Sequence, residues 1–108
     1  METAVANVTN TAQYSWTINV FEQRGTTWLG WKSNAPFRAQ QSQIHLYAGS
    51  FPSNPQDGTV SWTWINTASG TYDTGKPWGS GWCGAIIAEE RPNGPYTYVV
   101  KSQLTTDQ

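Results

Sequence analysis

Apolar and polar residues alternate with a period of two in short segments of this chain. In Tyr14–Phe21 (YSWTINVF), Trp16, Ile18 and Val20 fall on one face and polar residues fall on the other. Thr59–Asn66 (TVSWTWIN) alternates in the same way, so that its two tryptophans share a face. This pattern is typical of half-buried β-strands. No window keeps apolar residues at helical spacing for three turns, so no helix is expected.

Further strand signals recur at short intervals. We expect strands at Ala4–Asn10, Thr27–Lys32, Gln43–Tyr47, Ala85–Glu90 and Tyr96–Gln103. Gly, Pro, Asn and Asp separate them, most clearly in a loop at 48–58 and a hairpin at 91–95. Short strands at regular spacing are typical of a sandwich or a barrel. The sequence therefore predicts an all-β fold, an antiparallel β-sandwich of seven or eight short strands, in a single domain over residues 1–108.

The chain is weakly charged and rich in aromatic residues. It has 108 residues, a formal net charge of −1, seven Trp, five Tyr and three Phe. Each aromatic side chain can bury about 150–250 Å², which compensates for the small number of aliphatic residues. The six Lys and Arg residues are spread along the sequence, which argues against nucleic acid as a partner because phosphate binding needs clustered positive charge. The composition favours a polar, uncharged partner.

The sequence also carries signals of cellular location. No apolar run approaches the roughly 20 residues that a membrane-spanning helix needs. The first residues, METAVANVTN, lack the basic start and the apolar stretch of a signal peptide. Cys83 is the single cysteine, so no internal disulfide forms and a reducing compartment fits best. We expect a cytoplasmic protein, or one released without a signal peptide, and a secreted one if a signal has been removed.

The stretch TGKPWGSGWCG, residues 74–84, combines two Trp with four Gly. Glycine supplies no side chain to pack, so we expect a loop at 71–82 whose rings meet a flat ligand. A sugar has an apolar face, on which aromatic rings stack, and hydroxyls, which polar side chains bind. The predicted carbohydrate site in this loop contains Tyr72, Asp73, Lys76, Trp78 and Trp82. The alternative for the two tryptophans is that they close the open end of the sandwich.

The other tryptophans are assigned from their spacing. Trp16 and Trp62 lie in clean alternation and are predicted to belong to the core. Trp28 and Trp31 point in opposite directions if TWLGWK is extended, so one of them should lie outside. Trp28 and Trp31 are therefore included in the predicted carbohydrate site, as a contribution from a neighbouring turn.

Catalysis is not expected from the reactive residues of the chain. Cys83 and His45 are the one pair that could form a nucleophile and a base, but no third residue is specified to orient them. Glycoside hydrolysis needs two carboxylates across a cleft. Glu89 and Glu90 are adjacent and would point to opposite faces of a strand, so they cannot act together.

No metal or other cofactor is expected either. One His and one Cys cannot make a structural zinc site, and calcium needs clustered oxygen ligands. Asp57 and Asp73 lie in separate predicted loops, so they form no acidic cluster. The same two carboxylates would need a deep cleft to act as a glycosidase pair, and a domain of this size rarely forms one.

In size, single cysteine, missing signal and Trp content, the chain is similar to small soluble lectins of fungi and bacteria. The resemblance covers the whole chain as a class and rests on no shared motif. It implies a carbohydrate-binding protein, non-catalytic, whose partners are glycans. Because single shallow sugar sites bind weakly, we expect a homo-oligomer, a dimer first.

Two other functions stay open. A small β-sandwich with an aromatic loop resembles membrane-binding cytolysins of the aegerolysin or actinoporin kind, in architecture and aromatic richness, which implies a membrane-active or insecticidal defence protein. Exposed Trp and Tyr favour the bilayer interface, although polybasic support for anionic lipids is missing. The third possibility is a structural or assembly protein whose exposed tryptophans form a subunit interface.

Overall fold

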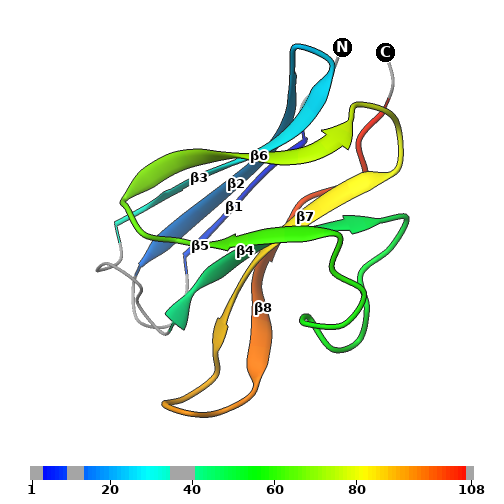
Figure 1. Cartoon of the computed structure of the whole chain (residues 1–108). Helices are drawn as coiled ribbons and strands as arrows, with labels where there is room; N and C mark the ends of the chain where they lie inside the picture. The colour runs from blue at the N-terminus through cyan, green and yellow to red at the C-terminus, as the bar shows by residue number, and fades with distance from the viewer. Residues whose placement is uncertain (1–3, 10–13, 35–40, 107–108) are drawn as a thin grey trace.

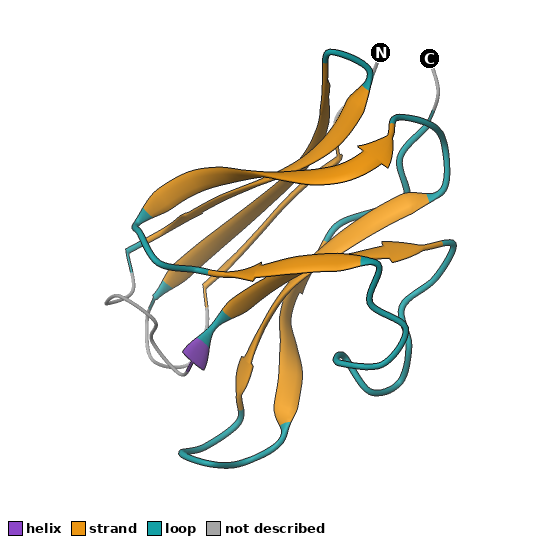
Figure 2. Cartoon of the chain, in the orientation of Figure 1, coloured by secondary structure: helices purple, strands orange, loops and turns teal. Residues whose placement is uncertain are grey.

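The protein is a sandwich of two antiparallel four-stranded sheets (Figure 1). The computed structural model describes residues 4–9, 14–34 and 41–106. Strands make up both layers (Figure 2), and the described residues contain eight strands and no α-helix. Among them there is accordingly no apolar helix of the length that crosses a membrane. The predicted all-β, antiparallel β-sandwich is confirmed.

Each sheet is assembled from two separate parts of the sequence. Sheet A has the strand order β1–β2–β3–β6, with the bounds Ala4–Thr9, Ser15–Gln23, Thr26–Ser33 and Ser69–Pro77. Sheet B has the order β5–β4–β7–β8, with the bounds Ser61–Trp64, Gln43–Ala48, Trp82–Glu89 and Tyr96–Lys101. The chain crosses between the sheets at β3–β4, β5–β6 and β6–β7, so no sheet is a simple meander.

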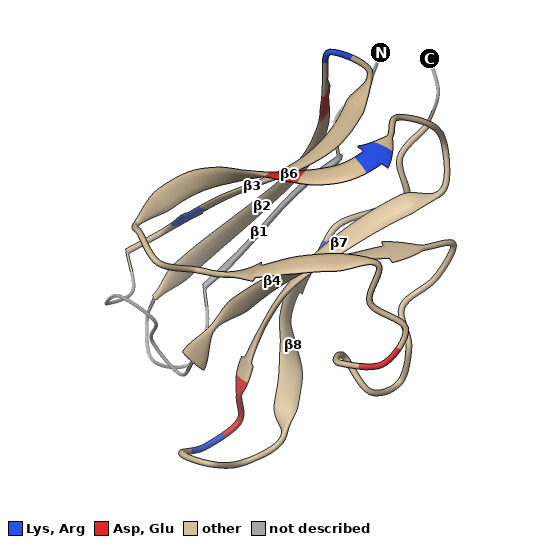
Figure 3. Ribbon diagram, viewed as in Figure 1, with Lys and Arg blue, Asp and Glu red and all other residues tan. Residues whose placement is uncertain are grey.

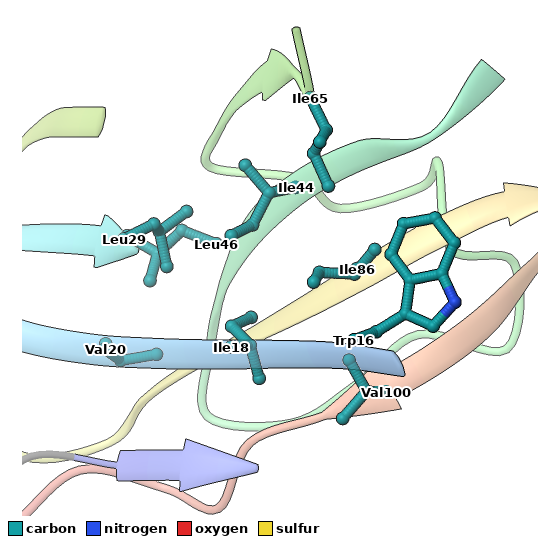
Figure 4. Packing of buried hydrophobic residues seen from close by; sticks show 9 residues of the cluster. All are labelled: Trp16, Ile18, Val20, Leu29, Ile44, Leu46, Ile65, Ile86 and Val100. Atoms are coloured by element: carbon teal, nitrogen blue, oxygen red, sulfur yellow. The ribbon is translucent and has the colours of Figure 1, made fainter. Parts of the chain in front are cut away.

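The core lies between the sheets (Figure 4) and takes side chains from both. Its buried residues are Trp16, Ile18, Val20, Leu29, Ile44, Leu46, Ile65, Ile86 and Val100. The alternating side chains of β2 supply the first three of these, as the sequence pattern predicts. Full burial of such a side chain stabilises the fold by about 1.5–3 kcal/mol. The core therefore fixes which face of each strand points inward.

A two-residue turn sets the register between β2 and β3. Arg24 and Gly25 both have positive φ, 54° and 80°, as a tight hairpin turn with matching twist requires. Glu22 accepts a hydrogen bond from the backbone N–H of Gly25. The turn pairs Gln23 with Thr26 and continues the register to the far end of the hairpin. The outer side chains of these two strands are thereby held in fixed rows.

The predicted loop at 71–82 is wrong, because most of it is strand. β6 runs to Pro77 and pairs with β3 through Thr71, Tyr72 and Asp73. The register then shifts at a bulge before Lys76, where Gly75 adopts φ 75°. Glycine tolerates this conformation, which is why a Gly-rich segment can remain in a sheet. The chain also re-enters the second sheet earlier than predicted, since β7 begins at residue 82.

Candidate functional site

The outer face of sheet A carries three rows of residues on β2, β3 and β6. Cross-strand partners in a sheet share a face, and the partners of the outward positions are fixed by the register. The rows are Phe21–Trp28–Asp73, Asn19–Gly30–Thr71 and Thr17–Lys32–Ser69. Side chains alternate along a strand, so this face is opposite the one that carries the core. Rings, amides, hydroxyls and charges are thereby brought together from three strands.

A glycine lies at the centre of this grid. A Cβ at Gly30 would stand 3.3 Å from Cε1 of Phe21, 3.7 Å from the Cβ of Asn19 and 3.7 Å from the carbonyl oxygen of Gly70. The Phe21 ring in turn packs at 6.3 Å, tilted, against the ring of Trp28. The missing side chain at Gly30 leaves space between this aromatic pair and the third row.

That space is part of a continuous depression, which we call the outer groove. Two adjoining hollows of about 280 Å³ each form it and share the residues Thr17 and Lys32. The first is lined by Thr17, Asn19, Phe21, Gly30, Trp31, Lys32, Gly70 and Thr71. The second is lined by Ser15, Thr17, Lys32, Ser33 and Asn34. The groove is open to solvent and follows the strands of the hairpin β2–β3.

The lining of the outer groove combines apolar and polar groups and is mostly neutral. Lys32 is its one charged residue in the described part of the chain. The Oδ1 atom of Asn19 is buried without a hydrogen-bond partner among the described residues. An unsatisfied buried acceptor costs about 1–3 kcal/mol. Asn34, in contrast, is engaged, because its Oδ1 accepts a hydrogen bond of 2.8 Å from the backbone N–H of Ser15.

Asp73 lies beside Trp28 in the first row of this face, and neither residue is among those that line the two hollows. The Oδ1 atom of Asp73 accepts a hydrogen bond of 2.9 Å from the backbone N–H of Gly75, so the bulge in β6 holds the carboxylate in place. Figure 3 marks this acidic position in β6 and a basic one in β3 on the same sheet. Among the seven residues of the predicted carbohydrate site, the structure brings Trp28 and Asp73 together as cross-strand partners.

Two other residues of the predicted site pack against the core, and one of them, Trp31, also lines the first hollow of the outer groove. Tyr72 packs against the core cluster, and its hydroxyl is hydrogen-bonded to Oγ of Ser61 at 2.7 Å. Trp31 also packs on this cluster, and its Nε1 donates to the carbonyl oxygen of Thr67 at 3.0 Å. Trp28 and Trp31 therefore lie on opposite faces, as their spacing predicts.

The remaining three lie at the end of sheet A. Trp78 and Trp82 are half-buried and pack against the core cluster. The indole of Trp82 donates to the carbonyl oxygen of Pro77 at 2.9 Å, and the backbone N–H of Trp78 donates to Gly25 at 2.9 Å. Lys76 follows the bulge, opposite Thr27. The rings thus fold back onto the sandwich, which is the alternative that the sequence left open.

Comparisons with protein-family models, with curated proteins and with solved structures find no match to this chain. The candidate site is therefore defined by its own residues.

The sequence pattern did not single out Phe21, Asn19, Gly30 or Lys32, although the alternation in YSWTINVF and TWLGWK contains their positions. The alternation within each strand indicates which of these residues share a face. It does not indicate which residues of the neighbouring strands lie opposite them.

A loop covers part of the outer face of sheet B, over Tyr47 and Tyr98. The hydroxyl of Tyr47 donates to the carbonyl oxygen of Pro55, and that of Tyr98 donates to the carbonyl oxygen of Pro52. The loop after β4 is thereby bound across this sheet. Phe51, from the same loop, packs edge-on at 5.5 Å against both tyrosine rings.

The prediction that Trp62 belongs to the core is wrong. Trp62 lies on the outer face of the edge strand β5 and is 41% exposed. Its ring stacks on His45 at 5.5 Å and meets Trp64 edge-on at 5.5 Å. The inward positions of this strand are taken by Ser61, which is bonded to Tyr72, and by Thr63. Trp16, in contrast, is 1% exposed, as predicted.

His45 and Cys83 do not form a catalytic pair in this arrangement. The two ring nitrogens of His45 are hydrogen-bonded to Thr59 at 2.8 Å and to Gln43 at 2.7 Å. Burial lowers the pKa of His45 to about 4. Cys83 is fully buried, its thiol contacts the carbonyl oxygen of Tyr47, and burial raises the pKa of the thiol. A buried thiol with a raised pKa is a poor nucleophile.

A larger hollow, of about 470 Å³, lies at the end of the hairpin β7–β8. Glu89 and Glu90 both border it, and β7 ends at Glu89, so Glu90 lies outside the strand that was expected to contain both. Glu90 pairs with Arg91 at 3.2 Å, and both side chains are more than half exposed. Exposed pairs contribute little to stability. No aromatic ring is among the described residues that line this hollow.

Proposed function

We propose that this protein binds carbohydrate, without catalysing a reaction on it, through the outer groove of sheet A. The observation that carries the proposal is the open space over Gly30 between the Phe21–Trp28 ring pair and the polar row of Thr17 and Lys32. A sugar needs an apolar surface for one face of its ring and hydrogen-bonding groups around its rim. The groove and the Phe21–Trp28–Asp73 row beside it supply both from side chains fixed on strands.

The polar groups beside the ring pair fit hydroxyl recognition. The Asp73 carboxylate accepts hydrogen bonds, the hydroxyl of Thr71 donates and accepts, and the amide of Asn19 has unmet hydrogen-bonding capacity. Asp73 shares the row of Trp28, and Asn19 and Thr71 belong to the adjacent row. Since regular strands position them, little conformational entropy is lost when a ligand binds.

The shape of the groove favours a chain of sugars over a single ring. Its two hollows follow one another along the hairpin, and each is close to the lower limit of the usual volume range for ligand pockets, about 300–1,000 Å³. The ligand class supported by this geometry is an oligosaccharide or a glycan chain that lies along the strands.

The proposal is tested by presenting the labelled protein to a glycan array, with liposomes as a parallel sample. We expect a narrow set of glycans to bind, and Trp28→Ala to weaken that binding tenfold or more while the melting temperature stays within a few degrees of wild type. Trp62→Ala, which removes a half-exposed indole from the opposite sheet, is the matched control when both variants are titrated with a soluble glycan from the array, so that avidity does not contribute.

Other outcomes of this experiment would overturn the proposal. Binding to liposomes with a blank array would favour the membrane-active function. If glycans bind but Trp28→Ala binds them as tightly as wild type, the sugar site lies elsewhere.

Self-association is a second candidate property, supported by the position of Trp62. It is a large exposed apolar side chain on the edge strand β5, and exposed aromatic residues are enriched at the centres of protein interfaces. A homo-oligomer would present several outer grooves to one glycan surface and raise the avidity. Sedimentation of wild type and Trp62→Ala over a range of concentrations tests this, and an unchanged monomer in both would reject it.

A further inference from the structure

We infer that the outer groove is built for an acidic oligosaccharide, with a carboxylate or sulfate group of one sugar bound by the ammonium of Lys32. This inference rests on the proposed carbohydrate function and names the class of sugar. It departs from the uncharged partner that the composition favours, because the few charges of this chain are not evenly placed.

The position of Lys32 carries the argument. It lines both hollows and therefore stands where they join, at the middle of the groove. Its ammonium forms no ion pair and no hydrogen bond with the described residues. No described carboxylate lines either hollow, so none of the described residues offsets the positive charge of Lys32 there.

The neighbours of Lys32 can also donate hydrogen bonds to an anionic group. Its cross-strand partners, Thr17 on β2 and Ser69 on β6, both carry hydroxyls that can donate hydrogen bonds to an anion. A lysine donates up to three hydrogen bonds, and hydrogen bonds to a charged acceptor are roughly twice as strong as neutral ones. An anion in this row would therefore receive donors from three adjacent strands.

The positions of Lys32 and Asp73 on the outer face of sheet A determine which way round an acidic oligosaccharide would lie. Trp28 lies four residues along β3 from Lys32, a separation of roughly 13 Å in an extended strand, and Asp73 lies opposite Trp28 on β6. This separation exceeds the screening length of about 8 Å at physiological salt, so Asp73 repels an anion at Lys32 only weakly. The acidic sugar would lie at Lys32, and the apolar face of a neighbouring sugar would lie on Trp28.

The inference is tested with matched soluble ligands and calorimetric titration at low salt. The probes are a trimer of galacturonic acid, the same trimer with all carboxyls methyl-esterified, and a galactose trimer that carries sulfate. We expect the acid to bind about fivefold more tightly than the ester, as an exposed ion pair allows, and to lose this advantage as salt is added. Preference for the acid trimer over the sulfated one, or the reverse, identifies the anionic group.

Three variants locate the effect. Lys32→Gln should abolish the preference for acid over ester, and Lys32→Arg should retain it. Lys101→Gln is the control, because it removes the same charge from the opposite sheet, where Lys101 lies over the rings of Phe51 and Tyr98. It should leave the preference intact.

The possible failures are distinguishable. If the ester binds as tightly as the acid, or if Lys32→Gln keeps the preference for the acid, the inference is wrong and the proposed carbohydrate function stands. If no probe binds and the glycan array is blank, both this inference and the proposed carbohydrate function are wrong.

Discussion

Trp28 and Asp73 are cross-strand partners on the outer face of sheet A, with the indole on β3 and the carboxylate on β6. Their juxtaposition joins an apolar ring to a hydrogen-bond acceptor within a single row of the sheet. Just beyond Asp73 the register of β6 shifts, and Gly75 donates its backbone N–H to the carboxylate. The bulge thus fixes the acceptor beside the platform.

Two substitutions at Asp73 separate its role in binding from its role in the bulge. Asp73→Asn keeps an oxygen for the N–H of Gly75 and removes the charge, so we expect an unchanged melting temperature and an affinity for neutral glycans lower by about 1 kcal/mol, or fivefold. Asp73→Ala also removes the hydrogen bond to Gly75 and should reduce stability by about 0.5–1.5 kcal/mol. Calorimetric titration and thermal unfolding measure the two effects. Equal affinity in wild type and Asp73→Asn would remove Asp73 from the site.

Filling the space over Gly30 should block binding without unfolding the protein. Gly30 does not have positive φ, so a larger side chain is compatible with its backbone. A β-branched residue in a strand interior is favoured over glycine by about 0.5–1 kcal/mol, although the Phe21 ring must yield slightly. We expect Gly30→Val to fold with near wild-type stability and to lose glycan binding in titrations. Gly79→Ala, at an open position outside the groove, is the control, and retained binding by Gly30→Val would contradict the site.

Trp78→Ala should destabilise the protein, although the sequence pattern places this residue in a sugar-binding loop. The ring packs against the core cluster, and its Nε1 is buried with no partner in the described part of the chain. Truncation of a fully buried Trp costs about 3–5 kcal/mol, and for this half-buried ring we expect about 2–3 kcal/mol. Urea unfolding measures the loss, with Trp28→Ala as the outer-face comparison. A Trp78→Ala variant of full stability that no longer binds glycans would restore the predicted site.

The alternation of apolar and polar residues predicted most strands because it is a local property. It identified β2 and the placement of Trp16 in the core, and it put Trp28 and Trp31 on opposite faces. It could not decide which face of β5 meets the core, because an edge strand can turn its larger side chains outward. Trp62 was assigned inward for this reason, whereas the smaller Ser61 and Thr63 occupy that side.

The site was harder to predict because it depends on register between strands. Gly75 and Pro77 in β6 are turn-forming residues, so the segment was predicted to be a loop, and a bulge with positive φ is what keeps it in the sheet. The rows that join Asn19, Gly30 and Thr71 require three strands to be aligned to within one residue. No periodicity within one strand contains that information.

The stability of the fold should decrease as pH falls below neutrality, because His45 is held in its neutral form. The ring is 2% exposed between Tyr47 and Trp62, and burial lowers its pKa from 6.5 to about 4. His45 therefore becomes protonated near pH 6.5 in the unfolded chain but only near pH 4 in the folded protein. The contribution of neutral His45 to the free energy of unfolding is complete above the pKa of the unfolded chain. It declines as the pH falls from the unfolded to the folded pKa, and about 2 kcal/mol of it is lost at about pH 5.

Urea unfolding at about pH 7.5 and at about pH 5 measures this linkage, and His45→Gln is the matched variant. The variant should be less stable at the higher pH, because it loses the stacking on Trp62. It should nevertheless lose less stability than wild type between the two pH values, since glutamine does not titrate. The carboxylates contribute equally to both proteins and cancel in the comparison. An identical loss in wild type and His45→Gln would mean that His45 takes up its proton as readily in the folded protein as in the unfolded chain.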